Sequence, residues 1–365
     1  MAEGGPSEDQ IARLRLIRSD NIGPVTYFQL LARFGSAAAA IDAIPDLAAR
    51  GGGRAPKLAS RAAVEREAET VARLGARYLF LGQGLYPPLL AELESAPPAL
   101  IVKGHLTLLD KPAVAMVGAR NASAAACRFA RTLAQDLGGQ GTVVVSGLAR
   151  GIDTAAHDGA LETGTIAVIA GGIDIFYPPE NEARQQAIAE RGLLVAEQPP
   201  GVEPRARHFP YRNRIIAGLA QGTVVVEAAP KSGSLITARY AAEYGREVLA
   251  VPGSPLDPRA QGCNQLIREG ATLIQNADDV LEALRPMAIR PFRQRDERYA
   301  APTAAPDASE QERQAVLDLL SPTPVSVDEI VRQSELPPAT VQMVLLELEL
   351  AGRLERHAGG RVSLA

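Results

Sequence analysis

The middle of the chain alternates short apolar runs with stretches of helical periodicity. Six segments contain such runs: residues 113–120, 142–151, 165–174, 193–198, 223–229 and 247–253. A run such as Val224-Val225-Val226 fits a strand that is buried on both faces. Amphipathic segments such as 123–138 and 235–245 lie between the runs. This alternation predicts an α/β domain over residues 75–285, with a doubly wound, mainly parallel, Rossmann-like sheet covered by helices on both faces.

Residues 1–74 have a different pattern, in which helical stretches rich in Ala, Leu and Arg predominate. Two of these stretches flank Asp20-Asn21-Ile22-Gly23-Pro24, so the region resembles a SAM or helix-hairpin-helix domain. The backbone amides of such a hairpin can bind a phosphate. Asn21 stands where a glycine is usual, and asparagine can also adopt the left-handed conformation. The alternative, which we favour, is a helical hairpin that only packs.

The segment 286–308 is rich in proline and charge and lacks periodicity, which predicts a linker. Residues 309–365 then predict three helices and a hairpin, the pattern of a winged helix-turn-helix. The first helix opens with the capping sequence Ser309-Glu310-Gln311-Glu312. The hairpin has Gly359-Gly360 at its tip. We therefore expect three folded domains, with the linker before the third.

The charge of this third domain argues against duplex DNA as its ligand. Residues 309–365 contain nine acidic residues and five arginines, a net charge of −4. The third helix has no lysine or arginine before Arg353, and Glu347 and Glu349 lie near its end. Since neutralisation of phosphates dominates affinity for DNA, a role in protein contacts is favoured.

Composition sets the wider class. The 365 residues are 46% hydrophobic and carry a net charge of −4, so any nucleic-acid site must be local. Cys127 and Cys263 lack the spacing of metal ligands and fit a reducing compartment. We find neither a signal-peptide pattern nor an apolar run long enough to cross a bilayer. A soluble, cytoplasmic protein without membrane contact is expected.

Candidate chemistry gathers at the predicted carboxyl ends of the strands, where glycines stand beside cations and hydroxyls. The candidate phosphate-binding residues are Gly118, Arg120, Ser146, Gly147, Arg150, Arg212, Asn213, Arg214, Lys231, Ser232, Gly233, Ser234 and Thr237. Because parallel strands end at one edge of a sheet, these loops are expected to converge. Residues 201–240 have six basic and two acidic side chains. A row of guanidinium groups with glycine amides suits a polyanion better than a single pyrophosphate.

Several familiar sites are missing from the sequence. There is no Gly-x-x-x-x-Gly-Lys-Ser/Thr loop, and no Gly-x-Gly-x-x-Gly sequence follows the first strand. The four histidines show no metal-ligand spacing. Asp153 and His157 could form a charge relay on one helical face, and Glu227 could act as an acid or base. We favour structural roles for these residues, with Glu227 paired to an arginine, and expect no catalytic residue, cofactor or metal.

Seven motifs together resemble one family. They are "MVGAR", "SGLARGIDTAAH", "AGGIDIFYPPEN", "FPYRNRIIAGLA", "EAAPKSGSLITA", "GREVLAVPG" and "GCNQLI". Their order and spacing are similar to those of the DNA-processing protein A family (DprA, also called Smf). The resemblance covers residues 75–285, and the flanking domains also resemble known family architecture.

The resemblance implies a protein without catalytic activity that binds single-stranded DNA, protects incoming transforming DNA and loads the RecA recombinase onto it, acting as a dimer. The DNA-binding pocket implied by the family falls on Arg120, Arg150, Arg212, Arg214, Lys231, Gly233, Ser234 and Thr237. A positively charged groove suits strand binding without sequence preference, and aromatic side chains often add stacking. Phe209 and Tyr211 are the nearest aromatic candidates, and Phe176 and Tyr177 are further ones.

Two other classes stay open at this point. Residues 230–235 resemble the loop of lysine-decarboxylase-like proteins, which would make this a nucleotide-binding hydrolase or sensor. Those proteins carry a catalytic glutamate a few residues after the loop, whereas residues 235–242 contain no acid. The third class, a regulator that reads DNA through the winged helix, is disfavoured by the charge of residues 309–365.

Overall fold

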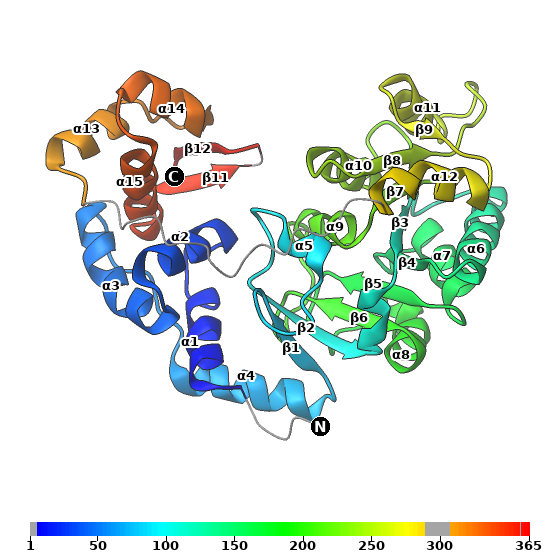
Figure 1. Ribbon diagram of the computed structural model, residues 1–365, viewed down its shortest axis with the longest axis horizontal. Helices are drawn as coiled ribbons and strands as arrows, with labels where there is room; N and C mark the ends of the chain where they lie inside the picture. The colour runs from blue at the N-terminus through cyan, green and yellow to red at the C-terminus, as the bar shows by residue number, and fades with distance from the viewer. Residues whose placement is uncertain (1–5, 289–306, 358) are drawn as a thin grey trace. The chain divides into compact units, whose positions relative to one another are not determined.

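The computed structural model describes residues 6–288, 307–357 and 359–365 (Figure 1). Contacts separate this part of the chain into two compact units. The first, which we call the sheet domain, covers residues 70–294, and the second, the terminal unit, combines residues 1–69 with residues 295–365. The sheet domain is therefore inserted between the two segments that make up the terminal unit.

Within the described residues, the sheet domain has a nine-stranded sheet of order β1-β2-β6-β5-β4-β3-β7-β8-β9. The strands are β1 (Arg77–Phe80), β2 (Ala99–Gly104), β3 (Ala113–Val117), β4 (Val143–Ser146), β5 (Thr165–Ile169), β6 (Leu193–Ala196), β7 (Gly222–Val225), β8 (Glu247–Ala250) and β9 (Thr272–Leu273). All neighbours from β6 to β9 are parallel. The predicted mainly parallel, doubly wound sheet is confirmed, and β1 and β2 add an antiparallel edge that the apolar runs do not predict.

The central strands are buried on both faces because alternate residues join two different cores. On β3, Ala115 and Val117 belong to one core, whereas Val114 and Met116 belong to the other. The helices that contribute to the first core are α5 (Pro88–Ala91), α9 (His208–Leu219), α10 (Ser234–Glu243) and α11 (Gln261–Arg268). Those that contribute to the second are α6 (Ala124–Gly139), α7 (Ile152–Ala160) and α12 (Ala277–Ala288). Helices thus cover both faces (Figure 1).

Three smaller elements complete the domain. Helix α8 (Glu182–Arg191) packs near β2, β5 and β6. Two short 3-10 helices, η1 (Leu106–Asp110) and η2 (Pro179–Asn181), lie in connections.

The strand order reverses in the middle of the sheet. From β3 the chain passes to β4, β5 and β6 on one side, and then returns to β7, β8 and β9 on the other. Open α/β sheets bind ligands at the carboxyl ends of the strands near such a reversal. The loops after β3 and β7 are therefore the first place to look for a site.

The first segment of the terminal unit is helical. Its helices are α1 (Glu8–Ile17), α2 (Pro24–Phe34), α3 (Ala37–Arg50) and α4 (Arg61–Arg73), the last of which continues into the sheet domain. Ser7 forms a capping box at the start of α1, and Ser36 caps α3. Asn21, in the hairpin between α1 and α2, has a φ of 59°. The predicted helical hairpin is confirmed, with asparagine in the left-handed conformation.

The second segment is the predicted winged helix. It contains α13 (Glu310–Asp318), β10 (Val325–Ser326), α14 (Val327–Ser334), α15 (Pro338–Leu350), β11 (Leu354–His357) and β12 (Arg361–Leu364). The small sheet has the order β10-β12-β11. Ser309 forms the expected capping box with Glu312 at the start of α13.

Most of the predicted linker, residues 289–306, lies outside the described residues, and residues 286–288 end α12. Within the described part of the chain, we find no helix whose length and apolar character would let it cross a bilayer.

Candidate functional site

The floor of the candidate site is formed where β4 ends. Asp153, in the first turn of α7, accepts hydrogen bonds through Oδ2 from the amides of Gly147 at 3.2 Å and Ala149 at 3.3 Å. Arg212, on α9, places its Nη1 at 3.9 Å from the same oxygen. A Cβ atom at position 147 would lie 1.2 Å from this Nη1. Glycine at 147 is therefore required for the guanidinium of Arg212 to lie here.

Burial controls the ionisation of this pair, because each side chain is only 7% exposed. Desolvation lowers the pKa of Arg212 to about 10; the charge of Asp153 opposes this shift and that of Arg120 adds to it. Desolvation also raises the pKa of Asp153, against the charge of Arg212 and the backbone hydrogen bonds. Arg212 stays charged at neutral pH. Its Nε finds no hydrogen-bond partner among the described residues, so the protein compensates this buried cation only in part.

Arg212 lines a cavity of about 220 Å³ together with Arg120 and Arg150. These three cations come from α9, from the loop after β3 and from the loop after β4. The rest of the lining is mainly apolar or backbone: Asn121, Gly147, Leu148, Ala149, Ile169, Ala170, Gly171, Ile175, Tyr177, Pro178 and Phe209. A cavity with several cations, apolar walls and glycine backbone suits an anion that carries an apolar group.

The two other arginines are more accessible than Arg212. The guanidinium carbon of Arg120 lies 5.1 Å from the ring centroid of Phe209. The ring centroid of Tyr177 is 5.6 Å from that of Phe209. Arg150 forms an ion pair with Glu180 at 2.8 Å, in which the side chains are 62% and 51% exposed. An ion pair with this exposure contributes little to stability, so an anionic ligand can replace Glu180 at low cost.

Close backbone contacts fix the loop that carries Arg120. Gly151 has a φ of 74°, and a Cβ atom there would lie 2.2 Å from the carbonyl oxygen of Ala119. The carboxylate of Glu227 accepts hydrogen bonds from the amide of Ser123 at 3.0 Å and from its hydroxyl at 2.7 Å. The carbonyl of Glu227 accepts one from the amide of Ala119 at 2.7 Å. Glu227 thus anchors this loop to the end of β7, and its predicted pairing with an arginine is limited to a longer-range charge interaction with Arg259.

The loop after β7 presents the remaining candidates. Lys231 is exposed and forms no ion pair with a described residue. The hydroxyls of Ser232 and Ser234 lie 2.7 Å apart at the start of α10, where Ser234 and Thr237 are buried. Asn213 donates from Nδ2 to the carbonyl of Gly233 at 3.3 Å, so it holds this loop to α9. Because β3 and β7 are neighbours, the loop begins beside the one that carries Arg120.

Three predicted site residues have other contacts. Arg214 is buried, with Nη2 2.5 Å from Glu197 Oε1 and Nη1 2.5 Å from the carbonyl oxygen of Ser95. The hydroxyl of Ser146 donates to the carbonyl of Met116 at 2.6 Å. A Cβ atom on Gly118 would lie 2.5 Å from Ile152, so this glycine allows close packing. None of the three lines the cavity.

The possible relay between Asp153 and His157 does not form. His157 Nδ1 is 2.7 Å from the hydroxyl of Thr165. Its burial lowers the pKa to about 3, so the imidazole is neutral at pH 7. The favoured structural role for His157 is supported, whereas Asp153 holds the loop beneath Arg212.

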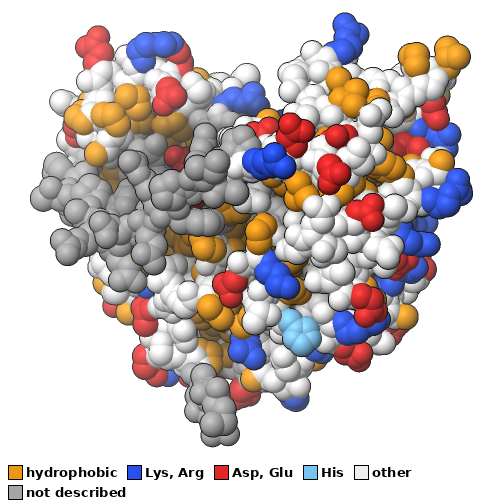
Figure 2. All heavy atoms as spheres, turned by 45° about the vertical axis from the view of Figure 1, so that its right-hand side comes forward, with side chains coloured by type: hydrophobic (Ala, Val, Ile, Leu, Met, Phe, Trp, Pro, Cys, Tyr) orange, Lys and Arg blue, Asp and Glu red, His pale blue; other side chains and the backbone are white. Residues whose placement is uncertain are grey.

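The charge of the visible surface agrees with a local site. On the face drawn in Figure 2, basic and acidic side chains are interspersed and form no broad basic field. Arg212 would not add to such a field, because it is buried. The three arginines of the candidate site instead converge on one cavity.

The sequence did not predict that Asn121, residues 169–171 and Ile175 line the cavity. A signal was present in "AGGIDIFYPPEN", because this segment follows β5 at the same sheet edge. It contributes Gly171, Ile175 and the ring of Tyr177 to the lining.

Three family models match the chain. The model described as DNA recombination-mediator protein A matches residues 77–285. The model of a DprA-like N-terminal HHH domain matches residues 7–70, and that of a DprA winged helix domain matches residues 300–360.

Relatives and solved structures with these names are similar over most of their length. DNA processing protein DprA of Streptococcus pneumoniae is 50% identical over 198 residues, which cover 54% of this chain and 70% of the relative. Protein Smf of Escherichia coli is 39% identical over 284 residues, 76% of this chain and 75% of the relative.

The X-ray structure of the Streptococcus pneumoniae protein superposes with a TM-score of 0.63 at 38% identity, covering 76% of this chain and 98% of that one. A structure of DNA processing protein A from Helicobacter pylori, described as giving insight into a single-stranded DNA binding mode, has a TM-score of 0.52 at 31% identity. It covers 57% of this chain and 95% of that one.

Proposed function

This chain belongs to the DNA recombination-mediator protein A family, and on that premise we propose that it is a DNA-processing protein that binds single-stranded DNA in the cavity lined by Arg120, Arg150 and Arg212. The observation that carries the proposal is the partly compensated charge of buried Arg212, which is seated against Gly147. Asp153 Oδ2 lies 3.9 Å from Arg212 Nη1, which is farther than a hydrogen bond. A phosphate oxygen bound in the cavity supplies Arg212 with a closer acceptor.

The geometry supports a nucleotide strand over a simple anion. The rings of Tyr177 and Phe209 line the same cavity as the arginines, so a base can stack where its phosphate is bound. Tyr177 is 44% exposed and therefore accessible to a base. Lys231, Ser232, Gly233, Ser234 and Thr237, on the neighbouring loop, are proposed to bind a further phosphate along the strand, with Asn213 holding that loop in place.

The wider role rests on the family. We propose that the protein protects incoming DNA during transformation and recombination, that it loads the RecA recombinase onto the bound strand, and that it acts in the cytoplasm as a homodimer. We also propose that it does so without catalysis. The cavity lining holds no carboxylate or histidine among the described residues, which gives little support to the hydrolase alternative.

A salt titration tests the proposal. Full-length protein is titrated with labelled oligo-dT and with blunt duplex of equal length, at several salt concentrations, by fluorescence anisotropy. We expect tighter binding of oligo-dT, with an affinity that falls steeply as salt rises. Arg120→Ala should reduce the salt slope by about one, as for the loss of one phosphate contact. Arg128→Ala, which changes an exposed arginine of α6 outside the cavity, is the control.

Two outcomes would contradict the proposal. One is equal affinity for oligo-dT and duplex. The other is a salt slope that Arg120→Ala and Arg128→Ala change by the same amount, because the binding would then depend on general surface charge.

A further inference from the structure

Helix α15 of the winged helix buries apolar residues on two sides. Val341, Val344, Leu345 and Leu348 belong to the core of the winged helix itself. The other buried apolar residues, Met343, Leu346 and Leu350, belong to a second core. The apolar residues of this one helix therefore belong to two different cores, which shows that it is covered on more than one side.

The rest of the second core comes from the helical segment. It includes Leu30 of α2, and Ile41, Ile44 and Leu47 of α3. In a helix-turn-helix the recognition helix enters the DNA major groove. Here α14 and α15 are the two helices of that motif, so the face of α15 directed away from its own domain is occupied by α2 and α3.

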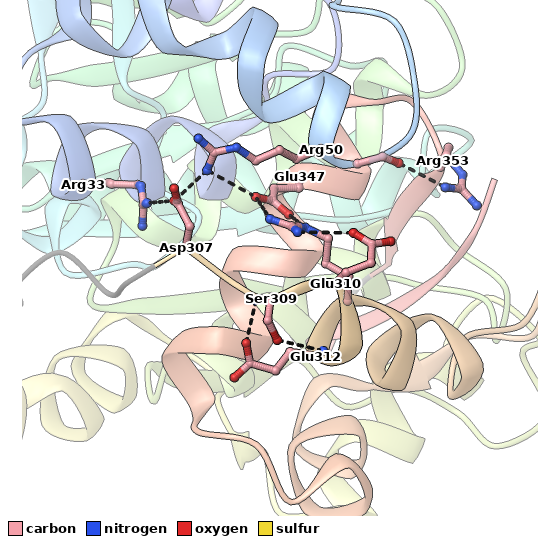
Figure 3. Close-up of polar contacts among 10 residues, drawn as sticks. Arg33, Arg50, Asp307, Ser309, Glu310, Glu312, Glu347 and Arg353 are labelled. Atoms are coloured by element: carbon pink, nitrogen blue, oxygen red, sulfur yellow. Dashed lines mark hydrogen bonds and ion pairs between the residues drawn. The ribbon is translucent and has the colours of Figure 1, made fainter.

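Ionic contacts, one of them to a buried carboxylate, accompany the apolar ones (Figure 3). The side chain of Glu347, on α15, is 0% exposed. Arg313 donates to it at 2.8 and 3.3 Å, and Arg50 Nη1 of α3 lies at 3.9 Å. Asp307 Oδ1 lies 2.5 Å from Arg33 Nη2 and 2.6 Å from Arg50 Nη1. Residues of both segments therefore compensate one another's charges.

The two backbones also touch, at a glycine triplet after α3. A Cβ atom on Gly51 would lie 2.2 Å from the carbonyl oxygen of Glu347, and one on Gly53 would lie 2.4 Å from that of Ala351. Arg353 Nη1 donates to the carbonyl of Gly51 at 3.0 Å. Only glycine lets the two backbones approach this closely, so the sequence of the helical segment is matched to the end of α15.

We propose that the partner of the winged helix is the helical segment of the same chain: α2 and α3 hold the recognition face of α15, so the two segments unfold together and α15 does not bind duplex DNA. The acidic character of α15 agrees, since Glu347 and Glu349 lie on it and it carries no basic residue. The face is thus an internal docking surface, and duplex binding through it would require the second core to open.

A matched pair of glycine substitutions tests the coupling. Gly51→Ala places a methyl group against Glu347, whereas Gly23→Ala meets no atom within 4 Å. Neither glycine has a positive φ, so alanine causes no backbone strain at either position. In full-length protein, we expect Gly51→Ala to speed amide hydrogen exchange at least about tenfold in both 24–50 and 338–350, a loss of about 1.4 kcal/mol. Gly23→Ala should leave residues 338–350 unchanged. Faster exchange confined to the residues around position 51 would overturn the coupling.

A cross-link tests the partner and the exclusion of duplex. Gln29 Nε2 donates to Gln342 Oε1 at 2.8 Å across the contact. In a Cys127→Ala background, Gln29→Cys and Gln342→Cys are joined with a short bis-maleimide. We expect a cross-link within one chain, and unchanged binding of blunt duplex and oligo-dT after locking. Cross-linked dimers would show that the partner is a second copy. A fall of more than about fivefold in duplex affinity after locking, about 1 kcal/mol, would show that α15 leaves α2 and α3 to bind duplex.

Discussion

The sheet domain and the terminal unit each place an arginine beside a buried carboxylate, at different distances. Arg212 in the sheet domain lies 3.9 Å from Asp153, has no partner for its Nε among the described residues, and lines a cavity. Arg313 in the terminal unit donates two hydrogen bonds to Glu347, whose side chain is fully buried. An arginine held at a distance from its buried carboxylate is available to an anionic ligand, whereas one in close contact with it serves the fold.

The comparison can be made within one helix. Arg212 and Arg214 both lie on α9 and are both buried, but Arg214 is paired with Glu197 at 2.5 Å. Burial therefore does not distinguish the arginine that lines the cavity from the one that is paired. The distance from each guanidinium to the nearest carboxylate does distinguish them.

The largest effect is expected from Arg212→Gln. Loss of the buried cation should weaken binding of oligo-dT about 100-fold, or about 2.7 kcal/mol, because the phosphate loses a desolvated, charge-assisted partner. Anisotropy titration of full-length protein measures this. Arg214→Gln is the matched change: it should lower thermal stability and leave the affinity of the folded protein within about twofold, since Arg214 does not line the cavity. Equal losses of affinity for the two variants would refute the distinction between them.

The second effect concerns the terminal unit. Arg313→Ala leaves the carboxylate of Glu347 buried with only Arg50 nearby, at 3.9 Å. We expect a loss of about 2 kcal/mol in unfolding free energy, less than usual for a broken buried pair because Arg50 remains. Denaturant melts followed by hydrogen exchange in 310–350 measure it. Arg332→Ala, on a 74% exposed side chain paired with Glu329, should cost less than about 0.5 kcal/mol. Similar losses for both variants would mean that burial of Glu347 has no energetic weight.

A smaller effect should appear in the sheet domain at acid pH. Burial lowers the pKa of His157 from 6.5 to about 3, so the unfolded chain binds a proton in this window that the folded chain does not. The contribution of neutral His157 to the free energy of unfolding is therefore fully present above pH 6.5 and is lost as the pH falls toward 3. At pH 5.5 the loss is about 1.3 kcal/mol relative to pH 7. Hydrogen exchange in 143–169 measures it, and His157→Gln should flatten the dependence. An unchanged profile in that variant would assign the acid sensitivity to other groups.

Strand periodicity predicted the parallel sheet well, because strands buried on both faces require unbroken apolar runs such as Val224–Val226. The antiparallel strands β1 and β2 were not predicted, because β1 has only four residues and its first, Arg77, is exposed. Apolar runs of this length do not separate strand from helix by periodicity alone.

The site was harder to predict than the sheet. Residues two apart on a helix point to different sides, so Arg212 and Arg214 could not both face one cavity; helical geometry alone contains that information. Which of the two faces the cavity depends on Glu197 and Asp153, which are distant in sequence. Similarly, "VQMVLLELEL" has more apolar residues than one helix face can hold, which indicates burial on two sides, but the sequence does not identify the second partner.

The order of the terminal unit along the chain has a consequence for synthesis on the ribosome. Helices α2 and α3 are made first, but the helix that covers their apolar face, α15, begins only at Pro338. The whole sheet domain is translated in between, and at roughly 5–20 residues per second this takes on the order of 15 to 60 s. Throughout that interval Leu30, Ile44 and Leu47 lack the cover of α15, so the nascent chain is expected to engage chaperones early and to release them only after the last helix emerges.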